Sequence, residues 1–112
     1  MTSRPLKLIV FARAAHEITE QAAYYRERAN VALAERWRTA VRNSIRPLRH
    51  FPESGSFFET QMPALTGMRR LRIEGFPNHL IFYEFDAPAN SVWIVSVLHG
   101  ARDLETLLQV RQ

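Results

Sequence analysis

The 112-residue sequence contains no cysteine, which excludes disulfide bonds and sites where cysteine binds zinc or an iron–sulfur cluster. Its longest purely aliphatic or aromatic run, residues 8–12, is far shorter than the roughly 20 residues that span a bilayer. The residues before this run lack the longer apolar region of a secretory signal. We therefore expect a protein of the reducing cytoplasm that does not insert into a membrane.

Lysine is almost absent, because Lys7 is the only one among 15 basic residues and all the others are arginine. Against 11 acidic residues, this gives a formal net charge of +4. The guanidinium group is a planar fork of donors that suits carboxylates and phosphates. The composition thus favours an acidic protein partner or a nucleic-acid backbone, although a biased genomic base composition would produce the same excess of arginine.

The shares of apolar residues, 46%, and of charged residues, 23%, are typical of globular chains and argue against disorder. A chain of this length suits one domain and leaves no room for a second core. No linker, internal repeat or low-complexity tract interrupts it. Residues 1–112 are therefore expected to form a single domain.

The first half of the chain predicts a strand and two helices. Residues 6–12 are rich in β-forming side chains and follow Pro5, which indicates a strand. One helical face then carries Ala15, Ile18, Ala22, Tyr25 and Ala29. A second carries Leu33, Trp37, Val41, Ser44, Ile45 and Leu48. Asn30 separates the helices, and Pro47 predicts a bend or an end near Arg46, so we expect an antiparallel hairpin.

The second half predicts a loop, three strands and a short helix. Residues 53–67 show no period and are expected to be loop. Strands are predicted at residues 68–74, 79–85 and 91–98, with turns at 75–78 and 87–90. The apolar residues 92–95 indicate a central strand covered on both faces. A final helix would dock Leu104, Leu107 and Leu108. The order β-α-α-β-β-β-α, with helices on one side of a mostly antiparallel sheet, is an α+β fold.

Five short strings occur in a characteristic order between about residues 6 and 108. They are Ala22-Ala-Tyr-Tyr25; the spaced Ile45, Leu48, Phe51-Pro52 and Gly55; Leu65-Thr-Gly-Met-Arg69; His79-Leu-Ile-Phe-Tyr83; and Val97-Leu-His-Gly-Ala-Arg-Asp103. The last string is the most specific, and the order and spacing of all five carry the comparison. In these features the chain resembles the RelE/ParE toxin family of bacterial type II toxin–antitoxin systems, and the ParE branch in particular.

The resemblance implies a small toxin of the plasmid-stabilisation type, held inactive by an acidic, ParD-like antitoxin. It implies no cofactor and no metal. In the ParE branch such toxins poison DNA gyrase, whereas in the RelE branch they cut messenger RNA on the ribosome. A shared fold does not choose between these activities, because function belongs to the site. A third alternative is an inactive relic kept only as a binding partner of the antitoxin.

The residues needed to cleave RNA without metal are only partly present. The reaction requires a base for the 2′-hydroxyl, cations for the phosphate and an acid for the leaving oxygen. Arg70 and Arg72 match the basic pair of the RelE pattern, but the arginine position on the next strand holds His79. His99 and Arg102 follow in a different spacing, and the C-terminal tyrosine is absent. This set favours gyrase inhibition by binding; the alternative is a ribonuclease that uses Arg70, Arg72 and His99.

The residues expected to bind the target are Arg69, Arg70, Arg72, His99 and Arg102. Those expected to bind the antitoxin are Tyr24, Trp37, Arg38 and Arg42, because aromatic and arginine side chains dominate interface energetics. Each set also has a structural interpretation. Arg38 and Arg42 lie on a helical stripe that would be solvated in any case, Arg70 and Arg72 suit an outer strand face, and Trp37 suits the core.

Overall fold

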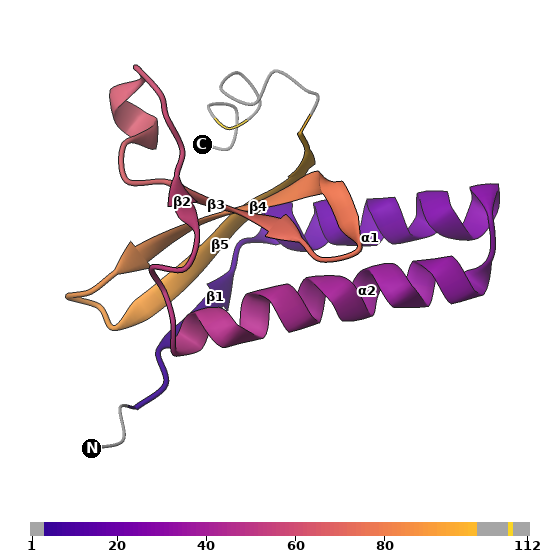
Figure 1. Ribbon diagram of the computed structural model, residues 1–112, viewed down its shortest axis with the longest axis horizontal. Coiled ribbons are helices and arrows are strands. Elements are labelled where there is room, and N and C mark those ends of the chain that lie inside the picture. Colours follow the sequence, from indigo (N-terminus) through magenta and orange to yellow (C-terminus); the bar gives the residue numbers. More distant parts are fainter. Residues whose placement is uncertain (1–3, 101–107, 109–112) are drawn as a thin grey trace.

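The computed structural model describes residues 4–100 and Leu108. The described elements follow the chain as β1 (Lys7–Val10), α1 (Ala12–Arg28), α2 (Val31–Ile45), the 3-10 helix η1 (Arg46–Arg49), β2 (Ser56–Phe57), the 3-10 helix η2 (Pro63–Leu65), β3 (Arg69–Ile73), β4 (Phe76–Asp86) and β5 (Ser91–His99). The strands form one sheet in the order β1-β5-β4-β3-β2 (Figure 1). Only β1 pairs in parallel, with β5, and the other described pairs are antiparallel. The predicted α+β class is confirmed, and the predicted helix containing Leu104 and Leu107 lies outside the described residues.

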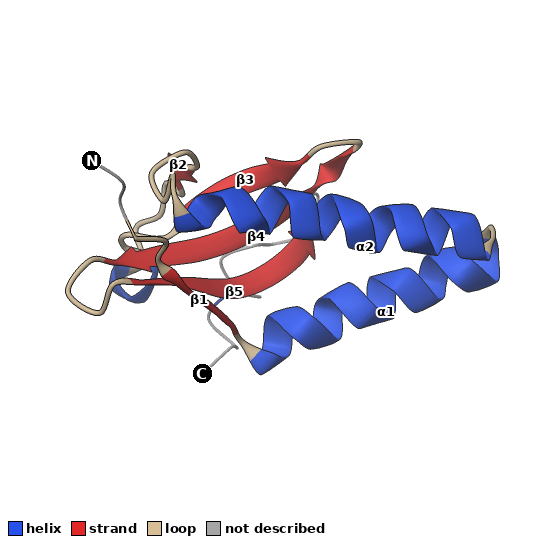
Figure 2. Cartoon of the chain, turned by 90° about the horizontal axis from the view of Figure 1, so that it is seen from below, coloured by secondary structure: helices blue, strands red, loops and turns tan. Residues whose placement is uncertain are grey.

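The two long helices form the predicted antiparallel hairpin and lie together on one face of the sheet (Figure 2). The tip of the hairpin extends beyond the strands, as both views show. Asn30 separates the helices by capping α2, since its side-chain oxygen accepts a hydrogen bond from the Leu33 amide at 2.8 Å. Such a cap satisfies one of the amides that the first turn of a helix leaves without a partner. The predicted break at Asn30 is therefore confirmed.

Pro47 determines where α2 ends. The α-helix stops at Ile45, and the chain continues as the single 3-10 turn of η1, in which Pro47 occupies an early position. The proline ring supplies no amide hydrogen and crowds the carbonyl four residues earlier, so a regular helix cannot pass through it. The tighter turn still buries Leu48 completely. The predicted early end near Arg46 is confirmed.

The sheet is covered by apolar side chains on both faces. Between the helices and the sheet lies a large cluster that includes Trp37, Val41, Ile73, Ile81, Tyr83, Val92 and Ile94. On the opposite face lies a smaller cluster of Leu65, Met68, Phe82, Val95, Leu98 and Leu108. Val92 and Val95 of β5 thus pack into different clusters, as expected of a central strand whose side chains alternate between faces.

Three details differ from the sequence prediction. On α1 the buried stripe begins at Ala14, which is fully buried as the predicted Ala22 is, whereas Ala15 is exposed, because one residue rotates the side chain by about 100° around the helix. Ala29, predicted on the same stripe, is exposed because it follows the last residue of the helix. Residues 53–67, predicted as loop, contain the short elements β2 and η2.

The turn before β4 is also shorter than predicted. Glu74 and Gly75 alone form it, with Gly75 at a φ of +85°, a backbone region that favours glycine. The strand therefore begins at Phe76 rather than at His79 and includes Pro77. Pro77 is tolerated because the register between β3 and β4 shifts there, so the missing amide interrupts no ladder hydrogen bond.

Candidate functional site

Arg70 and Arg72 form an exposed cationic pair on the sheet face opposite the helices. Leu71 and Ile73, which alternate with them along β3, pack into the helix-side cluster. The arginines pair in register with Phe82 and Leu80 of β4, which belong to the opposite cluster. Both arginines are exposed, so this face offers two guanidinium groups to a partner.

Arg69 is held by internal contacts instead. Its guanidinium donates to the Gly55 carbonyl at 2.7 Å and to the Glu53 carbonyl at 3.3 Å, and lies 3.7 Å from the Glu53 carboxylate. It also lies 4.0 Å above the Phe57 ring, a distance that suits a cation–π interaction. Only 13% of the side chain is exposed. Arg69, predicted to bind the target, thus holds residues 53–57 against the sheet.

His79 and His99 are neighbours on the helix-covered face of the sheet. They pair in register between β4 and β5, and their ring centroids are 5.1 Å apart. The His79 ring also contacts Trp37, at 4.7 Å between centroids, and Tyr25, at 6.4 Å. The structure therefore brings His99 together with His79 and not with Arg70 and Arg72. Sequence reasoning found no partner for His79, because its neighbours come from three other elements.

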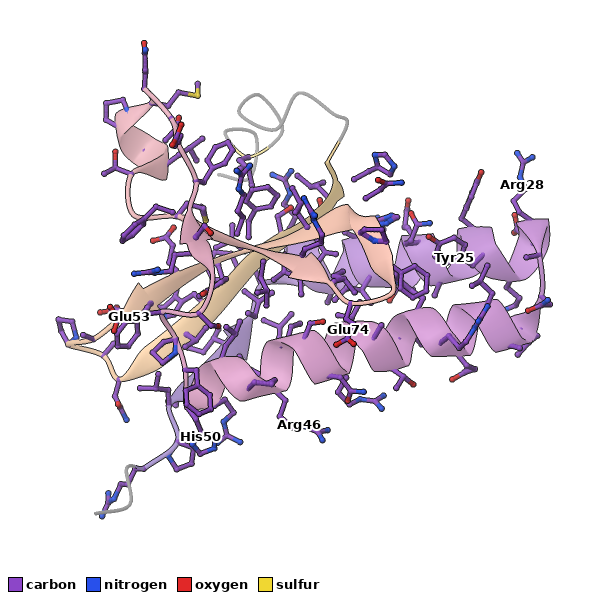
Figure 3. The ribbon with its side chains drawn as sticks, viewed as in Figure 1. Tyr25, Arg28, Arg46, His50, Glu53 and Glu74 are labelled. Atoms are coloured by element: carbon purple, nitrogen blue, oxygen red, sulfur yellow. The ribbon has the colours of Figure 1, made fainter. Side chains whose placement is uncertain are left out.

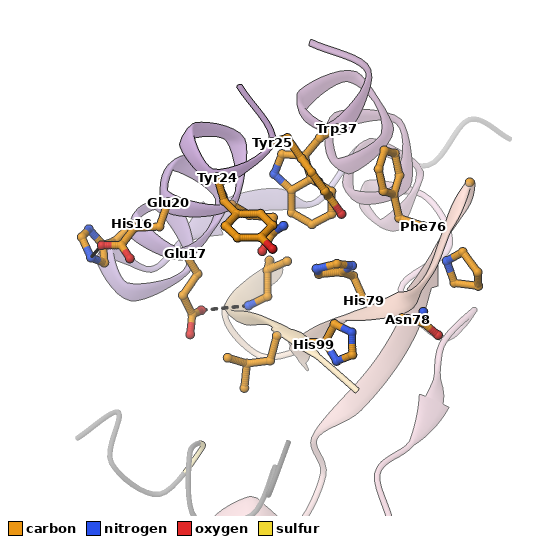
Figure 4. A pocket seen from close by; sticks show the side chains of 15 residues that line it. His16, Glu17, Glu20, Tyr24, Tyr25, Trp37, Phe76, Asn78, His79 and His99 are labelled. Atoms are coloured by element: carbon orange, nitrogen blue, oxygen red, sulfur yellow. Dashed lines mark hydrogen bonds and ion pairs between the residues drawn. The ribbon is translucent and has the colours of Figure 1, made fainter. Parts of the chain in front are cut away.

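These two histidines lie in a cleft of about 760 Å³ between the helical hairpin and the ends of β4 and β5. Tyr24 and Tyr25 project from α1 above it, while Asn78 and His99 lie on the strands below (Figure 4). Burial raises the pKa of the Tyr25 hydroxyl above its ordinary value of 10.0; a hydrogen bond with Gln21 lowers it, and Tyr24 raises it further. The fully buried Trp37 closes the cleft on the side of α2.

Glu17 joins α1 to β5 at the edge of this cleft. One carboxylate oxygen accepts hydrogen bonds from the Ser96 hydroxyl at 2.7 Å and from the Val97 amide at 2.9 Å. The other accepts from Arg13 at 3.2 Å. These contacts lie next to the shift in register between β4 and β5, where regular ladder pairing is interrupted. No local pattern could reveal them, since Glu17 and Val97 are 80 residues apart.

The residues predicted to bind the antitoxin occupy different environments. Tyr24 is 53% exposed and has the Arg28 guanidinium 5.4 Å above its ring. Arg42 is exposed and Arg38 is half-buried. Trp37 has no exposed surface, and its indole donates to the Ile18 carbonyl at 3.0 Å, so a partner cannot touch it without opening the core. Burial in the core, the structural interpretation of Trp37 from the sequence, agrees with the large apolar area of its side chain.

The helical stripe of Arg38, Arg42, Arg46 and Arg49 runs from α2 into η1, and two of its four members, Arg42 and Arg46, are exposed. Arg46 points away from the sheet (Figure 3), whereas Arg49 is half-buried and donates to the Leu6 carbonyl at 2.9 Å. A second groove, of about 880 Å³, runs between α2 and β3. It is lined by apolar residues, among them Leu33, Leu71 and Phe76, and by charged residues of both signs, Glu35, Arg36, Arg72 and Glu74.

Three further points concern Arg102, metal binding and membrane-spanning helices. Arg102, predicted to bind the target, lies outside the described residues. Among the residues that are described, no group of three histidine or acidic side chains is arranged to hold a metal ion. Nor does that part of the chain contain a helix with the length and apolar character needed to cross a bilayer.

Comparison with known proteins places this geometry in a family. A family model described as the ParE toxin of the type II toxin–antitoxin system parDE matches residues 8–104. No curated protein matches the sequence. Among solved structures, the chromosomal ParDE toxin–antitoxin system from P. aeruginosa is similar in fold, with a TM-score of 0.70, 15% identity, and coverage of 87% of this chain and 98% of that one.

The toxin–antitoxin complex RelBE2 from Mycobacterium tuberculosis is also similar, with a TM-score of 0.60 and 16% identity. The alignment covers 90% of this chain and 98% of that chain. At such low identity the two structures establish the fold, whereas the family model covers most of the sequence. The chain therefore belongs to the ParE toxin family of type II toxin–antitoxin systems.

Proposed function

We propose that this toxin inhibits DNA gyrase by binding to it, without a cofactor, and that it acts in the cytoplasm. The observation that carries the proposal is the separation of the charged and titratable groups. Arg70 and Arg72 lie on the exposed face of the sheet, while His79 and His99 pack together under the hairpin. A ribonuclease site needs its phosphate-binding cations and its proton donors around one phosphate. The arginine pair is better suited to holding an anionic partner surface.

We further propose that an acidic, ParD-like antitoxin neutralises the toxin. Both similar structures belong to toxin–antitoxin systems, which supports a partner of this kind. The groove between α2 and β3 combines apolar residues with Arg36 and Arg72, and Glu35 and Glu74 also line it. An amphipathic segment would bury its apolar side chains there, and the toxin's net charge of +4 would accelerate the association of an acidic partner.

The direct test is gyrase inhibition by purified toxin. We expect the full chain to block supercoiling or to accumulate cleaved DNA, and the purified antitoxin to reverse the effect. Arg70→Gln/Arg72→Gln should weaken the inhibition while leaving the fold intact, because both side chains are exposed. A toxin that leaves gyrase unaffected over a wide range of concentrations would contradict the proposal.

The alternative is a ribosome-dependent endoribonuclease that uses Arg70 and Arg72 to bind the phosphate and His99 as acid or base. The exposed arginine pair on one strand is the observation that favours it. Translating ribosomes incubated with the toxin would then yield cut messenger RNA, and His99→Gln would abolish the cleavage. Toxicity that persists in His99→Gln would exclude this mechanism.

A further inference from the structure

The cleft that contains His79 and His99 differs in charge from the rest of the molecule. Its 15 lining residues, all of them described, include the carboxylates of Glu17 and Glu20 but no arginine or lysine. The whole chain carries 15 basic residues and a net charge of +4. A negatively charged cleft in a cationic protein suits a cationic group of a partner.

The two carboxylates differ in how strongly they are already engaged. Glu17 accepts hydrogen bonds from Ser96, Val97 and Arg13 and is part of the framework. Glu20 pairs with the exposed His16 at 2.9 Å, and the Glu20 side chain is itself 67% exposed. Exposed pairs of this kind contribute little and exchange readily for another partner. Glu20 is therefore the carboxylate available to an incoming cation.

The aromatic walls of the cleft suit the same type of ligand. Tyr24 and Tyr25 line the cleft from above, and the His79 and His99 rings line it from below (Figure 4). The Tyr24 ring already has a guanidinium, that of Arg28, 5.4 Å from its centroid, so a cation of this size and shape fits against it. A planar guanidinium stacks on such rings while its edge donates to a carboxylate.

The cleft adjoins the groove between α2 and β3, because Gly75 and Phe76 line both cavities. The groove is lined by charges of both signs, Arg36 and Arg72 together with Glu35 and Glu74, whereas the cleft carries Glu17 and Glu20 without an arginine or lysine. A segment that lies along both cavities would therefore meet an excess of negative charge only in the cleft.

We propose that the cleft receives an arginine or lysine side chain of the polypeptide that binds this toxin, with a neighbouring apolar residue packed against Phe76. The identity of that polypeptide as the antitoxin rests on the proposed function, whereas the chemistry of the cleft does not. An antitoxin that is acidic overall would then carry a basic residue beside its apolar anchor. This local reversal of charge would set its register along the toxin.

The test uses short peptides and the full-length toxin labelled with ¹⁵N. Acetyl-Leu-Arg-Leu-amide is titrated into it, together with analogues that carry glutamine or glutamate in place of arginine. We expect the arginine peptide to cause saturable shifts at the amides of Tyr24, Asn78 and His99, and to bind about threefold or more tightly than the glutamine peptide. Equal affinities for the two peptides, or preference for the glutamate peptide, would overturn the proposal.

Two toxin variants test whether the arginine peptide binds in the cleft. Glu20→Gln should weaken binding of the arginine peptide by about threefold and leave the glutamine peptide unaffected. Glu27→Gln makes the same change in charge on an exposed residue of α1 outside the cleft, and it should leave both affinities unchanged. Equal losses in both variants would indicate a general charge effect and would count against the cleft. The samples contain neither gyrase nor antitoxin. A failure of the cleft proposal can therefore be distinguished from a failure of gyrase inhibition, which the supercoiling assay tests.

Discussion

At the level of single residues, the Tyr83 hydroxyl connects two of the strings that carried the family resemblance. It donates to the Pro52 carbonyl at 2.9 Å and accepts from the Gly55 amide at 2.7 Å. A Cβ atom at position 55 would lie 2.6 Å from this hydroxyl and 2.7 Å from the Arg70 carbonyl. Position 55 therefore requires glycine, since any Cβ atom would collide with the Tyr83 hydroxyl and the Arg70 carbonyl.

Removing the Tyr83 hydroxyl should destabilise the protein. Tyr83→Phe leaves the Gly55 amide and the Pro52 carbonyl without this partner in a buried place, which costs about 1–3 kcal/mol. The free energy of unfolding in urea measures the loss. Tyr24→Phe is the matched control, because its ring is 53% exposed and its change should be close to zero. Equal stabilities for Tyr83→Phe and the wild type would show that the hydrogen bonds contribute no net stability.

Tyr25 should make stability depend on alkaline pH. Burial raises the pKa of its hydroxyl in the folded state above the ordinary value of 10.0, so the folded state keeps its proton where the unfolded state loses it. The contribution is complete below pH 10.0 and is lost as the pH rises through the raised pKa. Urea unfolding between about pH 9 and pH 11 should show a steeper decline for the wild type than for Tyr25→Phe. Parallel declines would contradict this assignment.

At the level of elements, the attachment of α1 to β5 depends on one carboxylate. Glu17 supplies an acceptor to the Val97 amide where the register between β4 and β5 shifts. Irregular strand positions leave amides without ladder partners, and such groups are costly when buried. The side chain of Glu17 is only 18% exposed. In a variant without this carboxylate, water would therefore satisfy the Val97 amide only in part.

Glu17→Ala should therefore destabilise the protein by about 1–3 kcal/mol and increase hydrogen exchange at the Val97 amide. Glu20→Ala lies one turn further along α1 in an exposed ion pair, and it should change stability by less than about 1 kcal/mol. Amide exchange followed by NMR, with urea unfolding, separates the two. A Val97 amide that stays protected in Glu17→Ala would mean that another acceptor replaces the carboxylate.

At the level of the whole molecule, charge is divided between surfaces. The exposed Arg70 and Arg72 lie on one face of the sheet, and the hairpin covers the other face with its histidine-containing cleft beneath. We expect Arg70→Gln/Arg72→Gln to reduce gyrase inhibition by about tenfold or more at moderate salt, because two charge contacts to an anionic partner are lost.

Arg26→Gln/Arg46→Gln is the control for this double variant. It makes the same change in net charge on exposed positions of the helical hairpin and its end, and it should leave inhibition nearly unchanged. Dose–response curves of supercoiling at two salt concentrations provide the measurement. Equal losses in the two double variants would assign the effect to net charge and not to the sheet face.

The long helices and the longer strands of this protein could be predicted because their signals are local, whereas the short β2 and η2 were not predicted. Apolar spacing, Asn30, Pro47 and the alternation along β3 depend on residues within a turn or a strand, so the hairpin, the antiparallel strands and the α+β class follow from the chain itself. The exact start of β4 was missed, because the tolerance of Pro77 depends on the register of the neighbouring strand.

The environments of the functional residues required the folded chain. Arg69 and Arg70 are adjacent in sequence, yet one is bound by residues 53–57 and the other is exposed. His79, Trp37 and His99 become neighbours only when two strands pair and a helix packs over them. Side-chain contacts between distant segments depend on strand register and helix placement, which the whole core sets cooperatively and no short string encodes.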